Sequence, residues 1–121
     1  MRKTRVYLAT PYGHENMAVC VGRFEKVSTM AHRLMHEGYH VFSPISHSHP
    51  IAMLTNESHL DHAFWLDQDT AFLDWCDEVW VYCQPGWEES GGVDWEINWA
   101  LEEGKPVKLI NYETEEVKTY G

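Results

Sequence analysis

The clearest indication of the fold comes from residues 78–110, EVWVYCQPGWEESGGVDWEINWALEEGKPVKLI. This stretch opens with a run of β-branched and aromatic residues, 78–82, that is typical of a strand. After a polar loop, residues 93–103 carry apolar side chains at helical spacing and end before Gly104, a common helix stop. Residues 107–110 predict another strand. Strand, helix and strand in this order predict a right-handed crossover between two parallel strands.

The same alternation extends toward the N-terminus. Residues 5–10 and 39–42 predict two more strands, and the apolar spacing of residues 16–37 and 61–75 predicts two more helices. Residues 1–121 are therefore expected to form one α/β domain. It would be a doubly wound parallel sheet of four to five strands, with helices on both faces.

Two segments do not fit this alternation. Residues 43–58 combine prolines, serines and histidines without a sustained period, so we expect a long loop with a functional role. Residues 111–121 are polar, and we expect them to be a frayed tail.

Length and charge limit the class of protein. The 121 residues, 44% of them hydrophobic, are enough to fill one core. The net charge of -10, with 19 acidic against 9 basic side chains, would repel a phosphate backbone. We therefore expect no nucleic acid polymer as a partner, whereas a single nucleotide can be held by a few backbone amides.

The cysteines and the N-terminus bear on location. Cys20, Cys76 and Cys83 form no CxxC pair, which argues against both a disulfide framework and a four-thiolate zinc site. The apolar stretch after the basic N-terminus is too short for a signal peptide or a membrane span. We expect a cytoplasmic protein with reduced thiols and no membrane partner.

The loops after the strands are the expected ligand site, because open parallel sheets bind ligands beyond the carboxyl ends of their strands. In this sequence those ends are residues 10–14, 43–50 and 83–92, where Gly, Pro, Ser and His concentrate. Trp87 is a candidate for stacking on a base, although packing or a subunit contact is the default explanation for such a tryptophan. The candidate binding residues on these loops are Thr10, Pro11, His47, His49 and Trp87.

The start of the last helix predicts an anion site. Ser90, Gly91 and Gly92 stand where free amides would face a ligand and where glycine permits a close approach. The alternative is a simple serine N-cap with glycines that shape a turn. Glu96, in the first turns of the same helix, could point at the same crevice, but the helix dipole also favours a glutamate there without catalysis.

A second carboxylate is available from the preceding helix and its C-terminal end. The spacing alone does not choose between Asp67, Asp69, Asp74 and Asp77. Two carboxylates beside a bound sugar are the groups needed to displace a leaving group at an anomeric carbon.

The histidines allow a different interpretation. His47 and His49 are spaced HxH, and His59 and His62 follow, so a zinc-dependent hydrolase is an alternative. No HExxH motif or cysteine partner accompanies these histidines. We therefore predict hydrogen bonding to a ligand and no metal.

Four segments together resemble the nucleoside 2-deoxyribosyltransferase superfamily. They are VYLATPY (6–12), SPISHSHP (43–50), LDQDTAFLDWCDEVWVY (66–82) and GWEESGGVDWEINWALEEGKPV (86–107). They are most similar to a phage and bacterial branch with the SPIxHSHP loop, near the deoxynucleoside 5′-monophosphate N-glycosidases. The likeness runs in the same order over most of the chain.

The resemblance implies roles for single residues. Glu96 is implied to be the nucleophile that attacks C1′ of the deoxyribose, and Ser90 is implied to hold a 5′-phosphate. Asp69 lies eight positions before Asp77 and is implied to contact the base and handle protons. Tyr7 is implied to lie near the nucleophile and the sugar.

These implications give the expected function. The protein would cleave or exchange the N-glycosidic bond of a 2′-deoxynucleoside or its 5′-monophosphate, without a cofactor, as a homodimer or larger homo-oligomer. The alternative is a non-catalytic module that senses a nucleotide with the same crevice, in which Glu96 has only a structural task.

Overall fold

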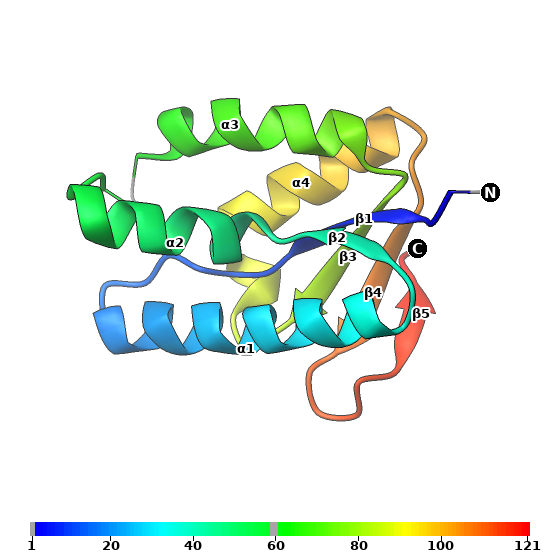
Figure 1. Ribbon diagram of the computed structural model, residues 1–121, viewed down its shortest axis with the longest axis horizontal. Helices are drawn as coiled ribbons and strands as arrows, with labels where there is room; N and C mark the ends of the chain where they lie inside the picture. The colour runs from blue at the N-terminus through cyan, green and yellow to red at the C-terminus, as the bar shows by residue number, and fades with distance from the viewer. Residues whose placement is uncertain (1, 59–60) are drawn as a thin grey trace.

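The computed structural model describes residues 2–58 and 61–121 of the chain. It contains a five-stranded sheet with helices around it (Figure 1). The elements in chain order are β1 (Arg5–Ala9), α1 (Met17–His36), β2 (His40–Phe42), α2 (Pro44–Thr55), α3 (His62–Trp75), β3 (Glu78–Cys83), the short 3-10 helix η1 (Trp87–Glu89), α4 (Gly91–Glu102), β4 (Val107–Asn111) and β5 (Val117–Thr119).

The sheet has the strand order β2-β1-β3-β4-β5, with parallel pairing from β2 through to β4. Side chains on β1 alternate between two cores. Val6 and Leu8 pack with residues of α1, while Tyr7 and Ala9 pack with residues of α3 and α4. The predicted doubly wound α/β fold is confirmed, and it has the flavodoxin-like strand order.

The position of the ligand crevice follows from this order. From β1 the chain moves outward to β2 and then returns to the other side of β1 as β3. The connection after β1 leads to β2 on one side, and the connection after β3 leads to β4 on the other side. At such a switch point a crevice opens beyond the carboxyl ends of the two strands.

The prediction of a loop over residues 43–58 was wrong, because residues 44–55 form helix α2. Ser43 caps the helix by accepting a hydrogen bond from the Ser46 amide, and Pro44 occupies the first turn, where its missing N–H costs nothing. Asn56, with φ 62°, ends the helix in the left-handed region. Helix α2 contains Pro50 and buries only a narrow stripe of residues, so its sequence shows no clear helical period.

The prediction of a frayed tail was also wrong. Strand β5 pairs antiparallel with β4, so the C-terminal segment adds an edge strand to the sheet. Asn111 builds the turn between them, because its side-chain oxygen accepts hydrogen bonds from the amides of Glu113 and Thr114.

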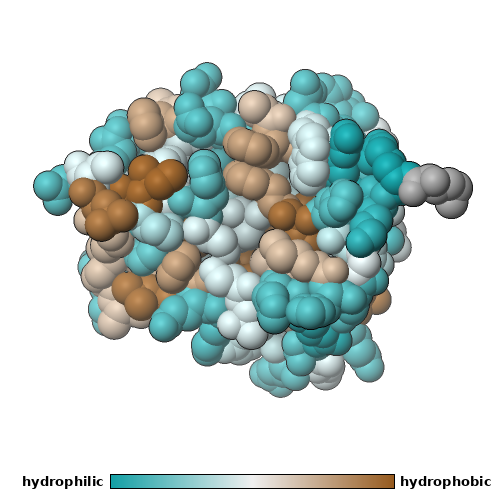
Figure 2. All heavy atoms as spheres, viewed as in Figure 1, coloured by the Kyte–Doolittle hydropathy of each residue, from teal (hydrophilic) through white to brown (hydrophobic). Residues whose placement is uncertain are grey.

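Apolar surface gathers at the end of the molecule where α2 ends and α3 begins (Figure 2). Among the described residues, the large apolar side chains exposed on these two helices are Ile51, Met53, Leu54 and Phe64. Within residues 2–58 and 61–121, no helix is both long and apolar enough to cross a bilayer.

Candidate active site

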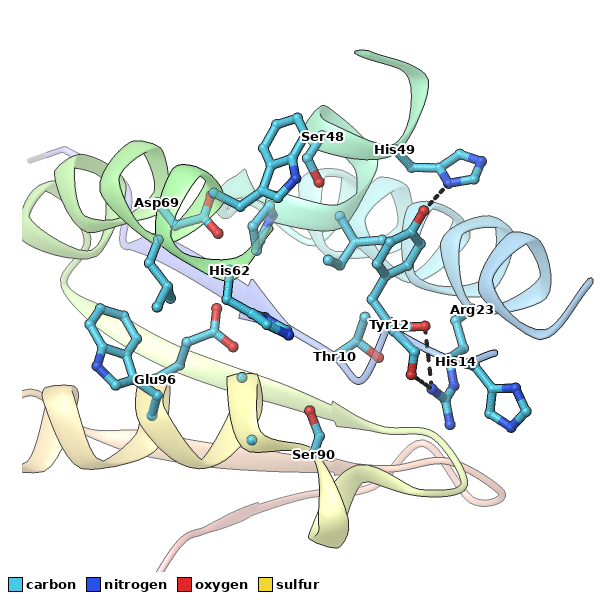
Figure 3. A pocket seen from close by; sticks show the side chains of 18 of the residues that line it. Thr10, Tyr12, His14, Arg23, Ser48, His49, His62, Asp69, Ser90 and Glu96 are labelled. Atoms are coloured by element: carbon cyan, nitrogen blue, oxygen red, sulfur yellow. Dashed lines mark hydrogen bonds between the residues drawn. The ribbon is translucent and has the colours of Figure 1, made fainter. Parts of the chain in front are cut away.

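A pocket of about 900 Å³ opens at the carboxyl ends of β1 and β3. Helices α2 and α3 form one wall and the start of α4 forms the other (Figure 3). The titratable and hydroxyl-bearing side chains that line it include Thr10, Tyr12, His14, Arg23, Ser48, His49, His62, Asp69, Glu89, Ser90 and Glu96.

Glu96 lies in the pocket wall with its carboxylate directed into the cavity (Figure 3). Its side chain is buried, with the residue only 7% exposed. The hydroxyl of Tyr7 donates a hydrogen bond to Oε2 of Glu96. The pleat of β1 turns Tyr7 toward the α4 side of the sheet, and this brings the two groups together.

The surroundings of Glu96 change its acidity. Burial raises the pKa of the Glu96 carboxyl to about 8, because the charged form loses its hydration. The hydrogen bond from Tyr7 lowers this pKa and the negative charge of Asp69 raises it. The Tyr7 pKa itself is raised well above its usual value by burial and by both carboxylates, so Tyr7 remains a donor near neutral pH.

Asp69 is the second carboxylate of the pocket. It lines the cavity from α3, and burial raises its pKa to about 7. By contrast, Asp77 lies away from the pocket in an ion pair with Arg2, at 2.6 Å, which lowers its pKa. Of the four aspartates considered from the sequence, Asp67, Asp69, Asp74 and Asp77, the pocket contains Asp69.

The two carboxyls titrate as a pair. With pKa values of about 8 for Glu96 and about 7 for Asp69, the pair holds close to one proton between pH 7 and pH 8. The higher pKa belongs to Glu96, so the shared proton must pass to Asp69 before Glu96 can act as a nucleophile and Asp69 as a proton donor.

The geometry at the start of α4 is compatible both with an anion site and with a simple serine N-cap. Ser90 caps α4, since its Oγ accepts a hydrogen bond of 3.2 Å from the Val93 amide. Ser90, Gly91 and Gly92 also line the pocket, and the hydroxyl hydrogen of Ser90 can still be donated. A Cβ on Gly91 would meet no atom within 4 Å, so a ligand has room to approach this backbone.

The two candidate residues of the loop after β1 differ in their access to the pocket. Thr10 lines the pocket, but its hydroxyl donates to the Tyr82 carbonyl at 3.0 Å and accepts from Gln84 Nε2 at 2.9 Å. Pro11 is buried and does not line the pocket. The structure therefore places Thr10, but not Pro11, where a ligand can be touched.

The two HxH histidines lie on different sides of α2, because residues two apart on a helix do not share a face. His49 lines the pocket, where its Nδ1 forms a hydrogen bond of 2.5 Å with the Tyr12 hydroxyl and its ring stacks on Phe24. His47 is exposed outside the pocket, with its ring near Phe72.

Trp87 also lies outside the pocket, because it packs against the core beneath α4. Trp95 packs on the same core and reaches the pocket lining. For the metal alternative, the residues that the structure describes contain no group of three or more His, Cys, Asp or Glu side chains able to hold an ion. His59 lies outside the described residues.

The sequence analysis missed the charged group at the other end of the pocket. Arg23 extends from α1 and donates hydrogen bonds to the carbonyls of Tyr12, Gly13 and Pro85, at 3.0–3.3 Å. Its guanidinium thus ties the loop after β1 to the loop after β3 at the pocket rim. The only signal in the sequence is a cation on the loop-facing end of an amphipathic helix, which is too common to select a residue.

A solved structure has the same fold. The chain is similar to a 2-deoxyribosyltransferase from the psychrotolerant bacterium Bacillus psychrosaccharolyticus, with a TM-score of 0.62 and 24% sequence identity. The similarity covers 88% of this chain and 71% of that chain, and at this level of identity it concerns the fold. That enzyme is described as a biocatalyst for the synthesis of antiviral and antitumoral nucleosides.

Among curated proteins, no sequence matched this chain significantly. The family model described as "Domain of unknown function (DUF1937)" matches residues 4–112, which is most of the chain. The protein with this pocket is therefore a member of the DUF1937 family.

Proposed function

We propose that this protein cleaves or transfers at the N-glycosidic bond of a 2′-deoxynucleoside or its 5′-monophosphate, with Glu96 as the nucleophile. The observation that carries the proposal is the buried Glu96 carboxylate at the pocket wall, hydrogen-bonded by Tyr7 and close to the charge of Asp69. A structural glutamate would not require a second, half-buried carboxylate that lines the same cavity.

The first step follows from this arrangement. Tyr7 holds Oε2 of Glu96, so the other carboxylate oxygen is available to attack C1′ of the sugar. The reacting form is the one in which Glu96 is ionised and Asp69 carries the proton that the two carboxyls share. The bond from C1′ to the base nitrogen breaks, and Asp69 donates this proton to the departing base. The products are a deoxyribosyl ester of Glu96 and the free base, and water or a second base resolves the ester.

The charge distribution of the pocket favours the monophosphate. Asp69 and Glu96 lie at one end of the cavity, and Arg23 lies at the other, beyond Ser90 (Figure 3). The acidic end suits the developing positive charge on the sugar, while the guanidinium end suits an anionic group. Glu89 also lines the pocket, so the anion would bind beside one carboxylate.

The comparisons support the proposal at the level of the fold. A 2-deoxyribosyltransferase has the same fold, and the sequence resembles the nucleoside 2-deoxyribosyltransferase superfamily in the pattern from Ser90 to Glu96. We infer from that pattern that the chain is a member of the superfamily's phage and bacterial branch near the monophosphate N-glycosidases.

Release of free base tests the proposal. The full chain would be incubated with each of the four deoxynucleoside 5′-monophosphates and the corresponding nucleosides, and free base would be measured by chromatography. We expect base release by the wild type and none by Glu96→Gln. Asp94→Asn, an exposed change on the same helix, is the matched control and should retain activity. No release by the wild type would refute the proposal.

The second candidate is a non-catalytic nucleotide sensor. It is favoured by the same Ser90 cap and the open glycines, because a helix start of this kind can bind an anion without any chemistry. Calorimetry separates the two functions. A sensor binds a monophosphate equally well with Glu96→Gln and gives no base on long incubation.

We also propose that the protein acts as a homo-oligomer. The support is the exposed apolar surface of α2 and α3, which lies beside the pocket and includes Leu54 at 86% exposure. Light scattering after size exclusion would measure the mass in solution. Leu54→Lys should lower the mass, and a monomeric wild type would refute the proposal.

A further inference from the structure

Helix α3 presents a stripe of four side chains to the pocket. They recur at three- and four-residue steps and are His62, Trp65, Leu66 and Asp69. Leu73 is the one residue of the described α3 that is fully buried in the core. The first turns of α3 therefore form a pocket wall, where side chains are free to meet a ligand.

His62 stands at the outer end of this stripe. It is the first residue of α3, and its imidazole extends into the cavity, across from the helix that carries Glu96 (Figure 3). The structure gives it no hydrogen bond or ion pair with another described residue, and it is exposed. Both ring nitrogens are thus open to water or to a ligand.

The other pocket histidines are already engaged. His49 is hydrogen-bonded to Tyr12 and stacked on Phe24. His14 accepts a hydrogen bond of 2.9 Å from the Asn16 amide at the rim. Neither of these imidazoles faces Glu96 across the cavity in the way that His62 does (Figure 3).

The second half-reaction needs a proton acceptor if water resolves the ester. Once the base has left, the sugar is bound through C1′ to Glu96, and the next nucleophile arrives from the opposite side of the ring. If water is that nucleophile, it must lose a proton as it attacks, and imidazole is the usual acceptor.

We propose that His62 is the general base that activates water against the Glu96 ester, so that hydrolysis is the reaction of this protein. The inference rests on the proposed function. In this step His62 accepts a proton from water, the water oxygen bonds to C1′, and the bond between C1′ and Glu96 breaks with its electron pair returning to the carboxylate. The proton then passes from His62 to bulk water.

Asp69 is the other candidate for this step, because it has given its proton to the base in the first half-reaction. It lies seven residues further along α3, a distance of about 10 Å on a helix axis. Its charge acts on both Tyr7 and Glu96, so it lies at the inner end of the α3 stripe. His62 is exposed at the outer end, where water enters.

The test separates the two half-reactions. His62→Ala and His62→Gln would be compared with the wild type by rapid quench, on the deoxynucleoside monophosphate that the wild type cleaves. We expect one equivalent of base to be released at the wild-type rate, followed by turnover about 100-fold slower. Sodium azide needs no deprotonation, so it should restore turnover of His62→Ala and yield a deoxyribosyl azide.

His47→Ala is the matched control, because His47 is an exposed histidine outside the pocket. It should keep wild-type turnover and gain nothing from azide. Unimpaired turnover of His62→Ala, loss of its first base equivalent, or failure of azide to restore turnover would overturn the role of His62 while leaving Glu96 chemistry intact. Absence of base release by the wild type would instead overturn the proposed function and this inference with it.

Discussion

Tyr7 on β1 and Glu96 on α4, 89 positions apart in the chain, share a buried hydrogen bond at the wall of the pocket. The tyrosine donates to one carboxylate oxygen and leaves the other turned to the cavity. This contact joins strand β1 to helix α4, which Ser90 caps, and it holds the carboxylate in place.

Tyr7→Phe tests this contact. The variant removes the donor that lowers the pKa of Glu96, so the carboxylate should be harder to ionise. We expect kcat to fall by about 10- to 100-fold. The acidic limb of the profile of kcat/KM against pH should move to higher pH. Tyr120→Phe, at an exposed position, should leave both unchanged.

Stability should depend on the ionisation of Glu96. Its folded-state pKa of about 8 lies above its usual value of 4.5, so the folded chain retains a proton that the unfolded chain releases. The wild type therefore loses stability as the pH rises from about 4.5 to about 8.

Glu96→Gln removes this loss, because a neutral amide has no proton to release. The free energy of unfolding of the variant minus that of the wild type should increase between pH 5 and pH 8.5, by on the order of several kcal/mol. Thermal melts across this range measure the difference. A difference that is independent of pH would contradict the burial of a titrating carboxyl.

Arg23 and Glu89 should have opposite effects on the choice of substrate. Arg23→Gln removes a positive charge from the pocket and should lower kcat/KM for a monophosphate about 10-fold relative to the nucleoside. Glu89→Gln removes a negative charge and should raise the same ratio. Using the ratio corrects for any loss of loop order when the three carbonyl contacts of Arg23 are removed. If both variants had the same ratio of kcat/KM for the monophosphate to that for the nucleoside, this would argue against an anion at the Arg23 end of the pocket.

Lys105 should stabilise the end of α3. Its Nζ donates to the carbonyls of Leu73, Asp74 and Cys76 at 2.7, 2.9 and 2.7 Å, so one cation satisfies the free carbonyls of the helix terminus. Lys105→Met should lower the free energy of unfolding by about 2 kcal/mol. Urea denaturation measures the loss, and Lys3→Met at an exposed position should give almost none.

The regular elements could be predicted because their signals are local. The strand at residues 78–82 and the helix that ends at Gly104 follow from short runs of apolar residues and a stop residue. Helix α2 was missed because its signal is a cap rather than a period. Ser43 and Pro44 mark its start, but two prolines and a weak apolar stripe favoured a loop.

The position of the site in the fold could be predicted, but most of its individual side chains could not. The order of strands and helices is enough to place the ends of β1 and β3 at one edge of the sheet. It also identifies the start of α4 as part of the site, with Ser90, Gly91, Gly92 and Glu96 as neighbours. Spacing did not separate Asp69 from three other aspartates, nor His49 from His47. Those choices depend on the direction in which a helix turns each side chain.

Periodicity and chain connectivity act over short distances, so the alternation of strands and helices, the parallel sheet and the edge at which a ligand can bind all follow from the order of residues. Which side chains meet at that edge depends on how the helices pack. The packing of α3 and α4 on the sheet buries Glu96 beside Tyr7, brings Asp69 and His62 from α3 to the same pocket and leaves His47 and Trp87 outside. Burial and proximity set the acidity of the carboxyls, and both arise from contacts between residues far apart in the chain.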